Sequence, residues 1–296
     1  MVERGAAARG AAARGPAGAQ RRLRAVLDGA GYEVLPFGGT AEAVLAHVPR
    51  SVPLTVTASP SRGTDATLAL TERLSAEGYR VAPHLSARMV PDAARLREVV
   101  ERLRAAGTTS VFVVGGDAQH AGEFPDARSL LQALHELEHP FTDIGIAGYP
   151  EGHASLGRDV LERSLAQKAP LAHHVVTQVC FDAGAITAWA REVAALGVHL
   201  PVRVGVPGAV GREKLLRISA GIGVGESARF LRKQPGLLRR FFTPRGYDPG
   251  PVLAGLAGQF DAPGHHLAGL HVFTFNDVAG TEAWRQDALR RLDRHR

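Results

Sequence analysis

Residues 110–150 read SVFVVGGDAQHAGEFPDARSLLQALHELEHPFTDIGIAGYP, and this stretch decides the fold. It opens with the β-branched run 110–117 and closes with the similar run 143–150. Between them, residues 129–137 carry leucines at the spacing of an amphipathic helix. A strand, a helix and a second strand in this order are typical of a βαβ unit. The stretch therefore predicts a parallel sheet covered by helices.

The same alternation occurs along the chain from residue 31 onward. Most of the runs begin 20 to 33 residues apart, which suits one strand–helix unit, and the last gap has room for extra helices. Further helical patterns occupy residues 64–77, 93–106 and 185–196. Eight strands that alternate with helices predict a (β/α)8 barrel, and an open doubly wound sheet is the alternative. The predicted strands are residues 32–37, 53–59, 80–86, 110–117, 143–150, 173–180, 202–207 and 269–276.

The composition is ordinary for a globular protein, with 296 residues, 45% hydrophobic and 22% charged. The single cysteine, Cys180, excludes an internal disulfide and a cysteine-rich metal or iron–sulfur site. No apolar run approaches the roughly 20 residues that span a bilayer. We therefore expect a protein of the reducing cytoplasm.

The net charge of +6 is concentrated near the N-terminus, because residues 1–24 hold six arginines and one glutamate. The rest of the chain is about neutral, which speaks against nucleic-acid binding. Residues 1–20 are low-complexity Ala/Gly/Arg without apolar periodicity. We predict a disordered basic tail over residues 1–24, with a transit peptide as the alternative. Residues 25–296 are predicted to form a single barrel domain.

Polar side chains follow most of the predicted strands. Because the active site of a (β/α)8 barrel lies at the C-terminal ends of its strands, we expect most of these side chains to face one shared mouth. They are Glu33, Thr57, Ser59, His84, Asp117, Tyr149, Glu151, His153, Gln178, Asp182, Asn276 and Asp277.

Glu33 is the strongest candidate among them, since a carboxylate in an apolar strand is costly unless it is paired or its pKa is raised. A raised pKa would suit a general acid. Structural roles compete with functional ones elsewhere. Asp182 is favoured as a helix cap, His84 suits a hydrogen-bonded structural residue, and His173 and His174 begin their strand, at the end of a barrel that serves stability.

Other kinds of site have little support in the sequence. No metal-ligand spacing, phosphate-binding Walker loop or Gly-x-Ser-x-Gly elbow is present, so no metal is expected. Residues 221–226 read GIGVGE and are similar to a glycine-rich nucleotide turn. They lack the preceding strand and the spacing of that turn, and an inter-helix turn is predicted instead.

The strand-end motifs, taken in chain order, resemble those of the methylenetetrahydrofolate reductases, a family of flavin-dependent (β/α)8 barrels. The resemblance runs from about Tyr32 to the C-terminus. The short motifs fall in the right order on successive strands, so their combination is more specific than any one of them. They are Tyr32-Glu33-Val34-Leu35-Pro36, Thr55-Val56-Thr57, Ala82-Pro83-His84-Leu85, Gly116-Asp117, Tyr149-Pro150-Glu151-Gly152-His153, and Thr177-Gln178 followed by Phe181-Asp182.

The resemblance implies FAD as cofactor and NADH or NADPH as co-substrate. It implies Glu33 as the general acid, Asp117 as a residue that tunes the flavin and meets the folate, and Gln178 as a ligand of the substrate ring. The residues that it implies as cofactor contacts are Thr57, His84, Asp117, Tyr149, His153 and Lys168.

Four departures from the family pattern lie around the same mouth. Gly115 replaces an arginine before Gly-Asp, and residues 58–60 read Ala-Ser-Pro in place of Tyr-Gly-Ala. The loop 206–211 lacks the aromatic residue that stacks on substrate in the family. Asp277 stands in place of an arginine, which reverses a charge where the folate is expected.

The resemblance implies reduction of 5,10-methylenetetrahydrofolate to 5-methyltetrahydrofolate, a reaction of one-carbon metabolism and methionine biosynthesis, in a protein that self-associates. Three alternatives stay open. One is a flavin-free enzyme of the same fold that passes hydride directly from the nicotinamide to the folate. The others are the same chemistry run toward oxidation, and a non-catalytic paralogue that binds folate or flavin.

Overall fold

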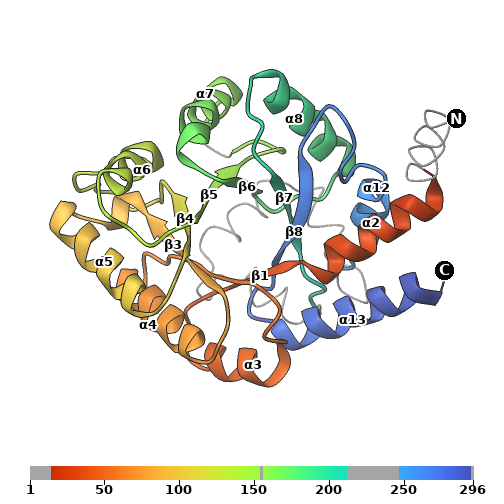
Figure 1. The fold of residues 1–296 in the computed structure, drawn as a ribbon, viewed down its shortest axis with the longest axis horizontal. Helices are drawn as coiled ribbons and strands as arrows, with labels where there is room; N and C mark the ends of the chain where they lie inside the picture. The colour runs from red at the N-terminus through yellow and green to blue at the C-terminus, as the bar shows by residue number, and fades with distance from the viewer. Residues whose placement is uncertain (1–14, 154–155, 212–246, 295–296) are drawn as a thin grey trace, which may run out of the picture.

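The computed structural model describes residues 15–153, 156–211 and 247–294. Eight parallel strands close into a barrel in the order of the chain, and the helices surround it (Figure 1). The last strand pairs with the first, so the open-sheet alternative is excluded. The strands are β1 (Gly31–Val34), β2 (Leu54–Val56), β3 (Val81–Ser86), β4 (Ser110–Val114), β5 (Asp143–Gly148), β6 (His174–Thr177), β7 (Val202–Pro207) and β8 (Leu267–Phe273).

The helices alternate with the strands as the periodicity predicts, and α12 (Gly250–Leu256) is the regular helix between β7 and β8. The rest of the gap in which extra helices are predicted, residues 212–246, lies outside the described residues. Residues 221–226, the predicted inter-helix turn, lie outside the described residues. Short 3-10 turns follow β3 (η1, Ala87–Met89) and precede β6 (η2, Ala169–Leu171). The α-helices are α2 (Pro16–Asp28), α3 (Thr40–His47), α4 (Gly63–Ala76), α5 (Ala93–Ala105), α6 (Ala127–His135), α7 (Arg158–Lys168), α8 (Ala183–Ala195), α12 (Gly250–Leu256) and α13 (Val278–Arg294).

Helix starts are set by short polar side chains. The carboxylate of Asp92 accepts a hydrogen bond from the Arg95 amide at the start of α5. Asp126 and Ser129 form a reciprocal capping box at the start of α6. These bonds satisfy amide groups that the helix itself leaves unpaired, and they fix where α5 and α6 begin after their strands.

The expected boundary of the N-terminal tail is wrong. Residues 16–24, predicted as part of the tail, form the first part of α2, which begins with Pro16 at its first position. Leu23 and Leu27 are buried on one face of this helix, which packs against α13 and β8. The four-residue spacing of the two leucines produces that face, although the surrounding Ala/Gly/Arg composition hides it. Residues 1–14 lie outside the described residues.

Alternation along β1 shows how the barrel sorts its side chains. Tyr32 and Val34 are fully buried, and the Tyr32 hydroxyl donates a hydrogen bond to the Glu282 carboxylate of α13 (2.6 Å). Successive side chains of a strand point to opposite faces, so Glu33 points into the barrel.

Among the described helices, none combines the length and the apolar character that crossing a membrane requires.

Candidate active site

Two histidines from two strands meet at the carboxyl group of Glu33, which lies on a third strand, β1. His271 Nε2 on β8 lies 3.1 Å from Glu33 Oε2 and is hydrogen-bonded to it. His84 Nε2 on β3 lies 3.5 Å from the same oxygen. The side chains of Glu33, His84 and His271 are 14%, 8% and 5% exposed, respectively. The group is therefore almost withdrawn from water inside the barrel.

The strand register explains why these residues meet. Gly31 is the partner of His271 in the pairing of β1 with β8, and Glu33 lies two residues further along β1 on the same face. β8 thus brings an imidazole under the carboxyl group from the neighbouring strand. The Thr57 hydroxyl at the end of β2 also contacts Glu33, and it donates to the Val34 carbonyl at 3.2 Å.

Of the two alternatives for Glu33, a paired carboxylate or a raised pKa, the structure shows the paired carboxylate. Burial does raise the pKa of the carboxyl group, but other interactions outweigh it. These are the hydrogen bond from His271, the charges of His84 and His271, and the Thr57 hydroxyl, and together they hold the pKa of Glu33 below its ordinary value. The sequence showed the apolar strand around Glu33 but not the two imidazoles. Glu33 is therefore a carboxylate at neutral pH.

His84 is a buried, neutral imidazole. Burial lowers its pKa to about 4, although the nearby Glu33 charge acts in the opposite direction. Its ring packs against Phe112 of β4, with 4.7 Å between ring centroids. Within the described part of the chain its Nε2 makes no hydrogen bond.

Asp117 lies at the end of β4 and is exposed. The preceding Gly116 has a left-handed backbone with φ +82°, and a Cβ there would collide with the hydroxyl of Ser86 at the end of β3. Glycine is therefore required for this close approach. Asp117 also acts on the loop after β5, because burial and then the Asp117 charge raise the pKa of Tyr149.

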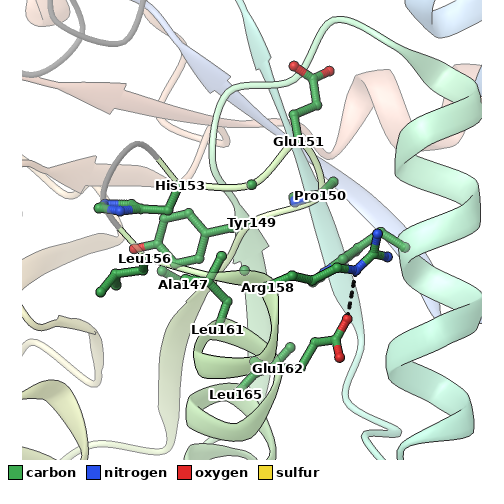
Figure 2. Close-up of a pocket in the computed structure, with 13 residues that line it drawn as sticks. Ala147, Tyr149, Pro150, Glu151, His153, Leu156, Arg158, Leu161, Glu162 and Leu165 are labelled. Atoms are coloured by element: carbon green, nitrogen blue, oxygen red, sulfur yellow. Dashed lines mark hydrogen bonds and ion pairs between the residues drawn. The ribbon is translucent and has the colours of Figure 1, made fainter. Parts of the chain in front are cut away.

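A cleft of about 320 Å³ lies beside the loop after β5, between α7 and α8. Figure 2 shows the rings of Tyr149 and His153 next to each other at this cleft, and their centroids are 5.3 Å apart. Glu151 points away from Arg158, which forms an ion pair with Glu162 at 2.9 Å. Tyr149 and His153 thus share one side of the loop.

Glu151 joins the loop after β5 to the loop after β6. Its Oε1 accepts hydrogen bonds from the amides of Phe181 (2.7 Å) and Asp182 (3.0 Å). Asp182 in turn caps α8 by accepting from the Gly184 and Ala185 amides, which confirms the structural interpretation of this residue. The two loops are therefore held together at the barrel mouth.

Gln178 follows β6 directly and is half-buried. Its amide oxygen accepts a hydrogen bond from the Val179 amide (2.9 Å). Its backbone amide donates to the Gly148 carbonyl of β5 (2.7 Å). These two bonds fix the side-chain amide beside the end of β5.

Lys168 lies apart from the Glu33 group. It is the last residue of α7 and is only 6% exposed. Burial lowers its pKa to about 8, while the charge of Asp126 acts in the opposite direction. No hydrogen bond or ion pair of its ammonium group is present among the described residues.

Sequence reasoning missed His271, although the residue has a detectable signal. Residues 269–273 read GLHVF, which places a histidine within a run of strand-forming residues.

Asn276, expected at the mouth, holds the loop after β1. Its side chain accepts from the Leu35 amide (2.8 Å) and donates to the Leu35 carbonyl (3.1 Å) and the Thr40 hydroxyl (2.8 Å).

A second polar group lies at the N-terminal end of the barrel, where His174 begins β6. His174 Nδ1 is 2.7 Å from Asp143 Oδ1, and Arg203 donates to Asp143 Oδ2 at 3.4 Å. This position agrees with the structural interpretation of His174.

Across the described ranges, no group of three or more His, Cys, Asp or Glu side chains is arranged to hold a metal ion.

Comparisons with known proteins place this geometry in a family. The model of a family described as methylenetetrahydrofolate reductase matches residues 40–221. A Caenorhabditis elegans protein named "Probable methylenetetrahydrofolate reductase (NADPH)" is 27% identical over 128 residues. That alignment covers 40% of this chain and 19% of the relative, so the chain matches about a fifth of the relative's length.

Two solved structures are similar at the level of the fold. An oxaloacetate acetylhydrolase has a TM-score of 0.51 and 13% identity, with 94% of this chain and 87% of that chain covered. A dihydropteroate synthase from Thermus thermophilus has a TM-score of 0.45 and 17% identity, with 90% and 94% covered. At this identity the first structure shows a shared fold and nothing about function. The second is too dissimilar in structure to show a shared fold.

Proposed function

The chain belongs to the methylenetetrahydrofolate reductase family, and from this premise we propose that it reduces 5,10-methylenetetrahydrofolate to 5-methyltetrahydrofolate with electrons from NADH or NADPH. The observation that carries the proposal is the Glu33 carboxyl group, held by two histidines inside the mouth of the barrel. The methylene carbon of the substrate bridges two nitrogens. One carbon–nitrogen bond must break before hydride can be accepted, and a proton on the departing nitrogen makes that break easier.

Three residues at the mouth have separate roles in the proposed reaction. Glu33 delivers the proton to the departing nitrogen. Gln178 turns its amide nitrogen toward the substrate ring, because its amide oxygen is already engaged by the Val179 amide. Asp117, exposed at the end of β4, accepts hydrogen bonds from the N–H groups of the ring. Orientation of this kind raises the rate by replacing random encounter with a fixed geometry.

Unpaired polar atoms near the mouth are available to a cofactor such as FAD. Among the described residues, His84 Nε2 and Ser86 Oγ are buried polar atoms without a hydrogen-bond partner, and buried polar atoms are usually paired. We propose that FAD is held by Thr57, His84, Asp117, Tyr149, His153 and Lys168. When bound and reduced by NADH or NADPH, FAD would supply the hydride that ends on the methylene carbon.

A second candidate is direct hydride transfer from NADH or NADPH to the folate, without flavin. The observation that favours it is that Thr57 and His84 are both directed at Glu33. The two candidates share the role of Glu33 and differ only in the carrier of the hydride.

The experiment that tests the function is anaerobic turnover of 5,10-methylenetetrahydrofolate by the purified protein with NADH and with NADPH, with 5-methyltetrahydrofolate as the measured product. Visible spectra before and after the nicotinamide decide between the two candidates. Flavin bands that bleach support the FAD route. Product formed by a colourless protein that FAD does not stimulate supports direct transfer. Absence of product in both the presence and absence of added FAD would overturn the proposed function.

A further inference from the structure

We infer that His271 is a positioning residue that holds the proton which Glu33 delivers, so that the acid is the Glu33–His271 pair rather than Glu33 alone. The inference rests on the proposed function and adds to it the origin of the proton. It starts from the hydrogen bond between His271 Nε2 and Glu33 Oε2, at 3.1 Å.

The groups that face Glu33 come from three neighbouring strands, and they are not equivalent. His84 of β3 lies at 3.5 Å and makes no hydrogen bond to the carboxyl group among the described residues. Thr57 of β2 contributes a hydroxyl group, which also donates to a backbone carbonyl. His271 of β8 contributes a hydrogen bond from a side chain that is 5% exposed. It is the best-placed of the three to pass a proton to the carboxyl group.

Proton accounting leads to the same residue. Glu33 has a lowered pKa and is therefore ionised at neutral pH, so it has no proton of its own to donate. His84, whose pKa is about 4, is neutral and holds no spare proton either. A hydroxyl group such as that of Thr57 is too weak an acid for this task. A paired imidazole and carboxylate can instead share one transferable proton within a buried site.

The transfer balances without any further reactant. The proton leaves Nε2 of the His271 imidazolium for Oε2 of Glu33, and the Glu33 carboxyl group passes it to the departing nitrogen of the substrate. The carbon–nitrogen bond breaks, and its electron pair stays on that nitrogen, where it binds the proton. Glu33 is then again a carboxylate and His271 a neutral imidazole, which regains its proton from water.

The surroundings of His271 suit this role. The charge of His271 acts on His174, which is paired with Asp143 at the N-terminal end of the barrel, where Arg203 also contacts Asp143. Asp143 and Arg203 are 33% and 43% exposed. His271 thus lies between the mouth, which the substrate covers, and a polar cluster with access to water at the opposite end.

The kinetic test compares the variants His271→Gln and His266→Gln. Glutamine keeps an N–H donor for Glu33 but cannot carry a transferable proton. We expect His271→Gln to lower kcat for folate reduction about 10- to 100-fold at neutral pH and to regain rate as the pH falls, because Glu33 must then be protonated from solvent. His266 is exposed and lies outside the site, so its variant should keep the wild-type pH profile. A wild-type profile in His271→Gln would overturn the inference.

A second measurement needs no substrate. In protein labelled with ¹⁵N-histidine, the His271 signals are assigned by their loss in His271→Gln. We expect an imidazolium signature at neutral pH in the wild type and a neutral imidazole in Glu33→Gln. The same protonation state in both proteins would show that the two groups share no proton, and the inference would be wrong. If the wild type fails to reduce the folate, the proposed function fails, and this spectrum still decides the pairing.

Discussion

A carboxylate inside a barrel is stable only when nearby groups offset the cost of its burial. In this chain the offset comes from side chains on β8 and after β2, the two neighbours of β1, and from one side chain on β3. His271 donates a hydrogen bond, His84 lies within 3.5 Å, and Thr57 contributes a hydroxyl group. In the proposed mechanism, the same contacts that stabilise the charge also prepare it for proton transfer.

The variant Glu33→Gln tests the chemical role of this residue. The amide keeps the size of the side chain but cannot transfer a proton, so we expect folate reduction to fall about 100-fold or more. Oxidation of NADH or NADPH by an artificial acceptor should be retained if the protein carries flavin. The matched control is Glu42→Gln, an exposed residue of α3. Wild-type folate turnover in Glu33→Gln would remove Glu33 from the mechanism.

Asp143 carries a prediction about acid stability. The hydrogen bond from His174, together with the charges of His174 and Arg203, lowers the pKa of Asp143 to about 2 in spite of its partial burial. The pKa of His174 is itself lowered, because burial outweighs the attraction of Asp143. The folded protein thus stabilises the ionised form of Asp143 relative to the unfolded chain, in which the pKa of an aspartate is about 3.9.

The sign of the pH effect follows from that difference. The stabilisation is present above about pH 4 and is lost as the pH falls toward the folded pKa of about 2. Asp143→Asn should therefore lower the Tm at pH 7 and reduce the fall in Tm between pH 4 and pH 2. Thermal melts followed by circular dichroism across this range measure it, with Asp28→Asn as an exposed control. Parallel curves for wild type and Asp143→Asn would contradict the assignment.

At the scale of elements, α2 shows how a short apolar stripe decides structure. Its composition is poor in large apolar residues, yet Leu23 and Leu27 face the barrel, and Arg24 donates to Asp293 of α13 at 2.6 Å. This helix and α13 lie side by side next to β1 and β8 (Figure 1). The N-terminal helix therefore covers the seam where the barrel closes.

The variant Leu27→Ala measures what this packing contributes. Leu27 is 1% exposed, so its truncation should lower the free energy of unfolding by about 2 to 5 kcal/mol. Arg21→Ala, an exposed position on the same helix, should change it by less than about 0.5 kcal/mol. Urea denaturation provides both values. Equal effects of the two substitutions would mean that α2 does not stabilise the barrel.

For the whole molecule, closure of the sheet joins the two ends of the described chain. β1 pairs with β8 as well as with β2, so the barrel has no free strand edge, and its halves cannot separate without breaking a ladder. We propose on this ground that the barrel unfolds as one unit. The two tryptophans make this testable, because Trp189 lies on α8 and Trp284 on α13.

Single-tryptophan variants report the two regions separately. In Trp284→Phe the fluorescence follows α8, and in Trp189→Phe it follows α13. After correction for the stability of each variant by circular dichroism, both fluorescence transitions should coincide with loss of helix, as two-state unfolding requires. A tryptophan transition that is displaced from the helix transition in either variant would show that the chain contains more than one folding unit.

The sequence by itself determined the barrel and the end of it where the candidate site residues lie. Alternating β-branched runs and helical periods are local patterns, and all eight strands overlap their predicted ranges. Placement of strand-end residues such as Asp117 and Gln178 at one mouth follows from parallel topology alone. The start of α2 could not be located in this way. Its two buried leucines stabilise the helix only by packing against α13 and β8, and a low-complexity sequence does not reveal that packing.

Only the tertiary structure decided the protonation of Glu33. The sequence left open whether Glu33 is paired or has a raised pKa. The carboxyl group is paired and its pKa is lowered, because His271, 238 residues away along the chain, hydrogen-bonds to it. The energy of a charge depends on the distance and burial of every group around it. Those distances come from the register of strands far apart in sequence, which no local pattern encodes.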